Sequence, residues 1–255
     1  MKVTPKKSLG QHFLNDKDIA ARIVSSLKAE GVSHVIEVGP GMGALTPMLL
    51  QKQNLDMRFV EIDADAAEYL KALYPEIKDK LIIADFLHYP LEECFGNKPL
   101  AVIGNFPYNI SSQIFFRILD YRSQVKEVVG MLQKEVAERI AAPPGSKVYG
   151  ITSVLLQAFY DIEYLFTVHE HVFTPPPKVK SGVIRLTRNN VEALPCNETL
   201  FFRVVKTAFN QRRKMLSNSL KSMLNEEHKT NPILSKRPEQ LGVSEFIELT
   251  QLVSN

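Results

Sequence analysis

The chain has 255 residues, 45% of them hydrophobic, and a formal net charge of +3 from 31 basic and 28 acidic side chains. This length suffices for one large domain or two modest ones, and so small a net charge does not by itself indicate a nucleic-acid partner. No apolar run approaches the ~18 residues of a membrane span, and the two cysteines, Cys94 and Cys196, lie far apart in the sequence, so we expect a cytoplasmic protein without membrane attachment or a disulfide framework.

The first half of the chain predicts strands that alternate with helices. A basic N-terminal arm with Lys6 and Lys7 lacks the apolar core of a secretory signal and precedes a helix over residues 17–27. Strands are predicted at 35–38, 57–62, 81–84 and 101–103, with helices over 46–50 and 66–73. This alternation favours an open α/β sheet, in which ligands bind at the carboxyl ends of the strands.

The second half continues this pattern and then becomes helical. We predict helices over 113–119, 133–141 and 151–160, and strands over 125–132, 162–168 and 183–186. Residues 189–199 are polar, contain Pro195 and indicate a linker. The predicted domains are therefore residues 1–188 and a small helical domain of residues 189–255.

The carboxyl ends of the first three strands carry glycines or carboxylates. Gly39 and Gly41 belong to a glycine-rich turn between a strand and a helix, which lets a ligand approach the backbone. Glu61 follows 22 residues after Gly39, where an acidic side chain can reach ribose hydroxyls, and Asp85 ends the third strand. The glycine pattern alone fits both a dehydrogenase and a methyltransferase, because NAD and S-adenosylmethionine each contain a ribose.

The segment after the fourth strand, residues 105–108, favours the methyltransferase. The side-chain oxygen of Asn105 and a backbone carbonyl can both accept from the exocyclic amine of a base, while Tyr108 offers a ring on which the base can stack. Two acceptors would draw the amine towards a tetrahedral geometry and free its lone pair for attack on a methyl group. A proline-containing turn with a buried tyrosine is the simpler alternative. Downstream, Pro175–Pro177 favour an extended segment that could hold Phe173 beside this edge of the sheet.

A basic stretch in the C-terminal part indicates a polyanionic partner. Residues 200–221 contain six Lys or Arg and no Asp or Glu, and their spacing predicts one helix with Arg203, Lys206 and Arg213 on a single face. Such residues bind phosphates with salt-dependent affinity, so we expect RNA or DNA contact rather than only a solvated helix face. His169 and His171 have no third ligand nearby in sequence, and we expect no metal.

Six ordered motifs resemble those of the bacterial small-subunit ribosomal RNA adenine dimethyltransferases, the KsgA family, over nearly the whole chain. They lie at residues 8–16 (SLGQHFLND), 37–41 (EVGPG), 61–63 (EID), 104–111 (GNFPYNIS), 133–137 (QKEVA) and 173–181 (FTPPPKVKS). The resemblance implies a Rossmann-like methyltransferase domain with a small helical C-terminal domain. It also implies S-adenosylmethionine-dependent N6,N6-dimethylation of two adjacent adenosines in the 3′-terminal hairpin of small-subunit rRNA, within an immature small ribosomal subunit.

The resemblance assigns roles to individual residues. The implied cofactor-binding residues are His12, Leu14, Gly39, Gly41, Glu61, Ile62, Asp85, Phe86 and Asn105. The implied catalytic residues, which would hold the target base, are Asn105, Phe106, Pro107, Tyr108 and Phe173. The expected RNA-binding residues are Lys6, Lys7, Lys178, Arg203, Lys206, Arg212, Arg213 and Lys214. We expect a monomer, because no exposed apolar patch is evident in the sequence.

Two departures and two rival functions accompany this resemblance. Phe106 occupies a position where the family usually has leucine, and His12 one where many members have asparagine. If only the carbonyl of Phe106 is used, the change is harmless, whereas a ring lining the base site could crowd a second methyl group. The rivals are a large-subunit rRNA adenine methyltransferase that confers antibiotic resistance, and a ribosome-assembly protein that binds without methylating.

Overall fold

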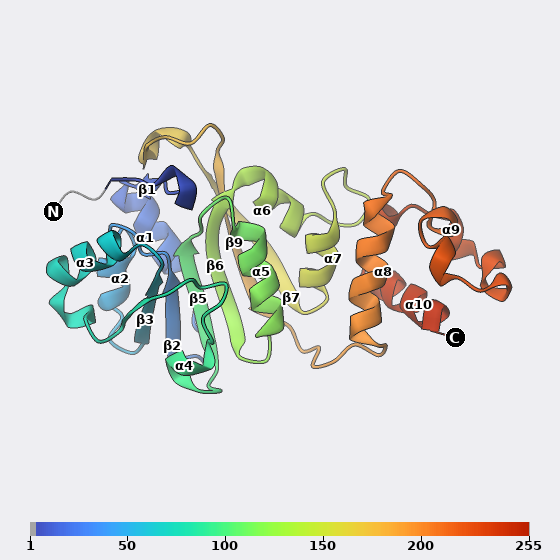
Figure 1. Ribbon diagram of the computed structural model, residues 1–255, viewed down its shortest axis with the longest axis horizontal. Coiled ribbons are helices and arrows are strands. Elements are labelled where there is room, and N and C mark those ends of the chain that lie inside the picture. The colour runs from blue at the N-terminus through green and yellow to red at the C-terminus, as the bar shows by residue number, and fades with distance from the viewer. Residues whose placement is uncertain (1–3, 255) are drawn as a thin grey trace. The chain divides into compact units, whose positions relative to one another are not determined.

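The computed structural model describes residues 4–254 (Figure 1). The nine strands of this part are β1 (Phe13–Leu14), β2 (His34–Val38), β3 (Asp56–Glu61), β4 (Leu81–Ile83), β5 (Leu100–Asn105), β6 (Val125–Gln133), β7 (Tyr160–Val168), β8 (Phe173–Thr174) and β9 (Ser181–Arg188). The α-helices in the same range are α1 (Lys17–Ser26), α2 (Thr46–Leu50), α3 (Ala64–Leu73), α4 (Glu92–Phe95), α5 (Ser111–Asp120), α6 (Lys134–Ala141), α7 (Ile151–Gln157), α8 (Glu198–Asn210), α9 (Leu216–Ser219) and α10 (Val243–Ser254).

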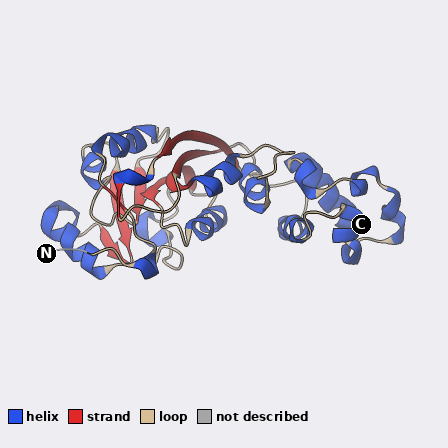
Figure 2. Cartoon of the chain, turned by 90° about the horizontal axis from the view of Figure 1, so that it is seen from above, coloured by secondary structure: helices blue, strands red, loops and turns tan. Residues whose placement is uncertain are grey.

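Seven strands form one sheet in the order β4-β3-β2-β5-β6-β9-β7. The neighbours from β4 to β6 pair in parallel, whereas β9 pairs antiparallel with β6. Helices lie on both faces of the sheet (Figure 2). The predicted Rossmann-like α/β fold is therefore confirmed. The strand order reverses between β2 and β5, and an open α/β sheet binds its ligand at the carboxyl ends of the strands beside such a switch point.

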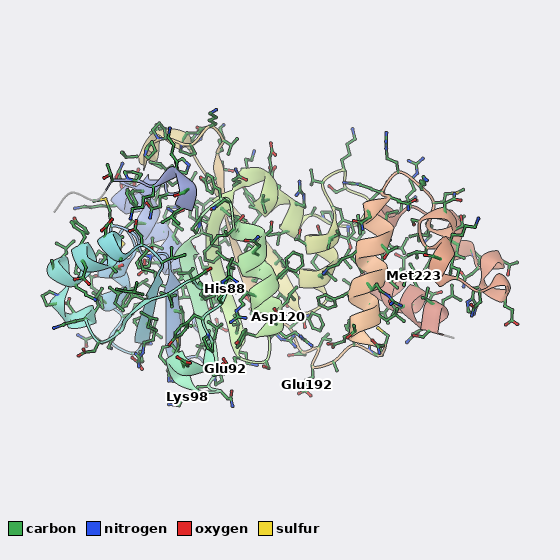
Figure 3. All side chains as sticks on the ribbon, viewed as in Figure 1. His88, Glu92, Lys98, Asp120, Glu192 and Met223 are labelled. Atoms are coloured by element: carbon green, nitrogen blue, oxygen red, sulfur yellow. The ribbon has the colours of Figure 1, made fainter. Side chains whose placement is uncertain are left out.

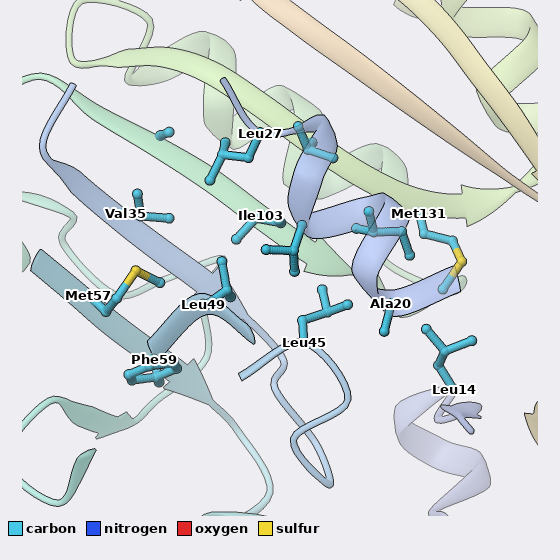
Figure 4. Close-up of a cluster of buried hydrophobic side chains, with 14 of the residues drawn as sticks. Leu14, Ala20, Leu27, Val35, Leu45, Leu49, Met57, Phe59, Ile103 and Met131 are labelled. Atoms are coloured by element: carbon cyan, nitrogen blue, oxygen red, sulfur yellow. The ribbon is translucent and has the colours of Figure 1, made fainter. Parts of the chain in front are cut away.

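An apolar cluster between the sheet and α1 and α2 holds these strand ends in place (Figure 4). Val35, Met57 and Ile103 come from three neighbouring strands and are at most 2% exposed. Leu45 and Leu49, at the start and in the body of α2, are buried against them. Burial of side chains of this size contributes about 1.5–3 kcal/mol each, so the loops that follow β2, β3 and β5 start from rigid positions.

The chain divides into two compact units whose boundary differs from the predicted one. The first unit holds residues up to 137 and 162–188, and the second holds 138–161 and 189 onward. Segment 138–161 was expected in the first domain. It groups with the second unit because α7 buries Val154, Leu155 and Leu156 and packs against α8 and α10.

The predicted helix over residues 200–221 is wrong in its length. Helix α8 ends at Asn210, a turn follows, and α9 begins only at Leu216. Arg212 explains part of this ending, because its guanidinium donates to the carbonyl of Ser146 and lies 3.9 Å from the Glu239 carboxylate. Arg203 and Lys206 therefore share a face of α8, whereas Arg213 lies in the turn and does not extend that face.

No helix within residues 4–254 is long and apolar enough to cross a membrane.

Candidate active site

A cavity of about 330 Å³ lies at the carboxyl ends of β2, β3, β4 and β5. It brings together every predicted cofactor-binding residue, and each predicted catalytic residue except Phe173. Residues 9–15 of the N-terminal segment form another part of its wall. The prediction that the polar strand ends converge on one site is therefore correct in its geometry.

The glycine-rich turn and Glu61 form one hydrogen-bonded unit. Gly41 has φ 57°, and a Cβ at this position would lie 3.2 Å from the ring of Phe13, so a side chain here would be strained and crowded. Its N–H donates to Glu61 Oε2, and the N–H of Asp63 donates to Glu61 Oε1, both at 2.9 Å. Two backbone donors thus fix both oxygens of a carboxylate that lines the cavity.

Glu61 is well suited to hold the two hydroxyls of a ribose. It is only 3% exposed, and burial raises the pKa of its carboxyl group although hydrogen bonds from the backbone act against the rise. Each of its oxygens keeps a lone pair that a hydroxyl could use. The hydroxyls of a ribose could therefore donate to this buried carboxyl group in addition to the N–H groups of Gly41 and Asp63.

Replacing Glu61 with glutamine should weaken binding of S-adenosylmethionine about 10- to 100-fold, because the charge and one acceptor are lost from bonds to the ribose. Titration calorimetry measures this directly. Glu68→Gln is the matched control, since Glu68 is an exposed residue of α3 that pairs with Lys71. Equal affinities for the wild type and the Glu61 variant would show that another residue binds the ribose.

Glu37 is a cavity residue that the sequence-based assignment omitted. It is 1% exposed, and its Oε2 accepts from Thr46 Oγ1 at 2.8 Å. Burial raises the pKa of this carboxyl to about 8, and the neighbouring Glu61 adds to the rise. At neutral pH Glu37 is therefore mainly protonated. The signal was its place in the motif at residues 37–41, directly before the glycines.

Glu37→Gln should gain stability relative to the wild type as pH rises. The folded-state pKa of about 8 lies above the ordinary value of 4.5. Folding therefore takes up a proton between these values, and this contribution is full below about pH 4.5 and lost as pH rises towards 8. The cost to the wild type amounts to roughly 3 kcal/mol at pH 7. Urea unfolding of both proteins at pH 5 and pH 8 measures the difference, and a difference independent of pH would contradict the assigned protonation.

Asp85 follows β4, and each of its two carboxylate oxygens has a partner within the protein. Its Oδ1 accepts from the N–H of Leu87, and its Oδ2 lies 2.8 Å from Nδ1 of His88. His88 is exposed on the surface (Figure 3). Ile62 is 50% exposed, lines the same cavity and offers an apolar surface. A carboxylate beside an apolar side chain suits the amine and the flat face of an adenine.

Asn105 has a defined orientation. Its Nδ2 donates to the backbone carbonyl of His12 at 2.9 Å. This bond occupies the amide nitrogen and so identifies which end of the side chain is the oxygen. Asn105 Oδ1 is thus the end available to accept from the amine of a target base.

Tyr108 is held from two sides. Its hydroxyl lies 2.5 Å from Ser181 Oγ at the start of β9, and its ring centroid lies 5.3 Å from that of His12. Burial raises the pKa of the Tyr108 hydroxyl, so the side chain is neutral at physiological pH. His12 is itself anchored, with Nδ1 2.8 Å from the carbonyl of Pro175. The contacts with Ser181 and His12 therefore fix the position of the Tyr108 ring.

Phe106 and Phe173 are both buried. The Phe106 ring is 0% exposed and packs edge-on against Phe115, with ring centroids 5.8 Å apart. The Phe173 side chain is 2% exposed, belongs to the apolar core and does not line the cavity, so its role toward the base stays a prediction. The cause of its burial is its place in β8, opposite Leu14 of β1, in a two-stranded sheet that the sequence did not predict.

The predicted RNA-binding residues fall into two groups. Lys7, Lys178, Arg203, Lys206, Arg213 and Lys214 are exposed. Lys6 and Arg212 are engaged within the protein, Lys6 with Asp63 and Asp65, and Arg212 with Ser146 and Glu239. The ion pairs of Lys6 with Asp63 and Asp65 lie next to the cavity, and the sequence did not predict them. Among the described residues, no group of three His, Cys, Asp or Glu side chains could hold a metal ion.

Fold and site together define the class of protein. A doubly wound sheet carries a glycine-rich turn and two carboxylates, the buried Glu61 and Asp85, around one cavity. These groups fit the ribose and the adenine of S-adenosylmethionine. The chain is a methyltransferase that uses this cofactor. More particularly, it belongs to the ribosomal RNA adenine dimethylase family, whose sequence model matches residues 3–242. Its reaction is dimethylation of adenine in ribosomal RNA.

Relatives agree with this family, and solved structures have a similar fold. Proteins named ribosomal RNA small subunit methyltransferase A are 59% identical in Cytophaga hutchinsonii, over 99% of this chain and 98% of that one, and 58% identical in Flavobacterium johnsoniae, over 99% and 97%. The fold is similar to that of a dimethyladenosine transferase from Plasmodium falciparum, with TM-score 0.77 and 24% identity over 93% of this chain and 96% of that one. It is also similar to the 23S rRNA methyltransferase ErmE, with TM-score 0.69 and 23% identity over 95% and 100%.

Proposed function

We propose that this enzyme dimethylates N6 of two adjacent adenosines in the 3′-terminal hairpin of small-subunit rRNA. The relatives that support the choice of subunit are similar over nearly their full length. The observation that carries the chemistry is the orientation of Asn105, whose amide nitrogen is used by His12 and whose oxygen remains for the substrate.

The chain's own residues would act by binding and orienting the target base. An adenosine taken out of its stack, at a cost of a few kcal/mol, would lie against the ring of Tyr108. Its amine would donate to Asn105 Oδ1 and to the carbonyl of Phe106. These acceptors draw the amine towards a tetrahedral geometry, and no strong base is needed because the proton becomes acidic as the new bond forms. When bound, S-adenosylmethionine supplies the electrophilic methyl group.

The second transfer places a further demand on the same residues. After one methylation a single N–H remains, so the monomethyl amine must turn until that N–H again meets an acceptor. The buried Phe106 ring supports a role for the main chain of this residue alone, because the side chain is enclosed by the core. Leu and Phe at this position would then present the same carbonyl to the base.

The wider setting follows from the same proposal. The substrate would be an immature small subunit, reached by a monomeric enzyme in the cytoplasm. The exposed basic residues of the second unit, Arg203, Lys206, Arg213 and Lys214, would contact its phosphates, and Lys7 and Lys178 would do so from the first unit. Arg212 would act mainly by shaping the turn after α8, through its bonds to Ser146 and Glu239.

Methyl transfer to purified ribosomal particles tests the proposal. Labelled S-adenosylmethionine is incubated with the enzyme and unmodified small subunits, naked small-subunit RNA or large subunits, and the nucleosides are then analysed. We expect dimethyladenosine in small subunits. Label in large-subunit RNA would assign the enzyme to the resistance-type reaction, and tight binding to small subunits without label would mean that only an assembly role remains.

A further inference from the structure

The N-terminal segment of residues 6–15, here called the strap, forms part of both the cofactor site and the base site. Residues 9–15 line the cavity. The ring of Phe13 contacts the glycine-rich turn at Gly41. The carbonyl of His12 accepts from Asn105. The strap therefore touches the turn that faces the cofactor and the residue that faces the target amine.

One buried carboxylate ties the beginning of the strap to the sheet. Asp63 follows β3, and its side chain is 0% exposed. Its Oδ1 accepts from Lys6 Nζ at 2.6 Å, and its Oδ2 accepts from Gln11 Nε2 at 3.0 Å. Gln11 in turn accepts from the N–H of Lys6 at 2.8 Å, which closes a small ring of bonds. The two strap residues thus share one anchor.

The same aspartate belongs to the cofactor site through its backbone. The N–H of Asp63 donates to Glu61 Oε1 at 2.9 Å, so the anchor and the Glu61 carboxylate are adjacent in one network. Burial by itself would raise the pKa of Asp63, but the bonds from Lys6 and Gln11 hold it below its ordinary value. The same ion pair raises the pKa of Lys6. Both groups are therefore charged throughout the physiological range.

The far end of the strap is secured separately. The N–H of Asn15 donates to the carbonyl of Val172, and its Nδ2 donates to Thr174 Oγ1. Strand β1 pairs with β8 in the same region. His12 lies between these two anchors and is also held by the carbonyl of Pro175. Loosening the Asp63 anchor would therefore free residues 6–11 first, and residues 9–11 form part of the cavity wall.

We propose that Lys6 and Gln11 are positioning residues, which hold the strap closed over the bound cofactor through Asp63 and thereby orient Asn105 for methyl transfer. Lys6 is then a latch for the cofactor site and not an RNA contact. Its removal would leave the buried Asp63 carboxylate without a charged partner, which favours an open strap. An open strap releases the cofactor faster and holds His12, whose carbonyl accepts from the amide of Asn105, less firmly.

Two adjacent lysines allow a matched experiment on the full chain. Lys6→Met removes the latch, whereas Lys7→Met removes an exposed neighbouring charge. The dissociation constant of S-adenosylmethionine is measured by calorimetry without RNA, and amide hydrogen exchange is followed in residues 9–15. We expect Lys6→Met to weaken cofactor binding about tenfold, a factor within the range of typical coupling between sites. The same variant should speed hydrogen exchange in the strap. Lys7→Met should change neither value.

Two further variants make the test specific. Lys6→Arg keeps the charge and should restore most of the affinity. Asp63→Asn removes the other half of the buried pair. Adding Lys6→Met to it should cost much less affinity than Lys6→Met costs in the wild type, because the Lys6–Asp63 pair is already broken and only the pair with the exposed Asp65 remains. The proposal is overturned if Lys6→Met leaves the cofactor affinity unchanged and weakens only RNA binding, as Lys7→Met would. It is equally overturned if the affinity falls without faster exchange in the strap.

Discussion

Replacing Asn105 with alanine is expected to lower kcat for methyl transfer by about two to three orders of magnitude, the usual effect of removing one preorganised polar contact from a reacting centre. The variant loses the oxygen that we propose accepts from the target amine and draws this amine towards a tetrahedral geometry. Affinity for S-adenosylmethionine should fall much less, because Glu61 and Asp85, which we expect to bind the ribose and the adenine, are unchanged.

Single-turnover methylation of small-subunit RNA and calorimetry with the cofactor separate these two effects. Asn54→Ala is a suitable control, since Asn54 is exposed in the loop between α2 and β3 and touches no part of the cavity. It should methylate at the wild-type rate. A turnover of the Asn105 variant close to that of the wild type would remove this residue from the chemistry, even if the cofactor still bound normally.

Replacing Gly130 with alanine should destabilise the first unit by about 3 kcal/mol and lower Tm by about 10 °C. Gly130 of β6 lies directly opposite Gly104 of β5, and the ring of Phe106 covers this glycine pair. A Cβ on Gly130 would lie 2.5 Å from Phe106 Cε2. The ring cannot move aside easily, because it is fully buried and packed against Phe115.

A second substitution tests this cause. Phe106→Leu shortens the side chain that the new methyl group meets, so the double variant should be less destabilised than the sum of the single changes, by at least about 1 kcal/mol. Gly242→Ala is the matched glycine control, because the nearest atom to its added Cβ is 3.6 Å away. Purely additive losses in thermal unfolding would show that the ring of Phe106 is not what excludes a side chain at Gly130.

The candidate site was predictable to the extent that it depends on local chain geometry. Parallel strands end at one edge, so polar residues placed after β2, β3, β4 and β5 converge without knowledge of the packing. Gly41, Glu61, Asp85 and Asn105 could therefore be chosen from their positions alone. The pairing of β1 with β8 was not predictable in this way, because it joins segments about 160 residues apart through two residues each.

Three features were decided by partners distant in sequence. Lys6 looked like one more charge of a basic arm, but Asp63 binds it across 57 positions. Phe173 is buried in the core because its strand, β8, pairs with β1 at the other end of the first unit's sequence. Helix α8 looked continuous through Arg213, but the turn that follows it is tied through Arg212 to Ser146.

The amino-acid sequence by itself determined the alternating strands and helices, the glycine-rich turn and the order of polar residues along the sheet edge, because these follow from periodicity and backbone preferences within a few residues. Only the tertiary structure decided which end of the Asn105 amide is bonded to His12, where the rings of Phe106 and Phe173 lie, and that Lys6 pairs with Asp63. The physical reason is that hydrogen bonds and burial depend on which distant groups the fold brings within contact distance, and local sequence patterns do not contain that information.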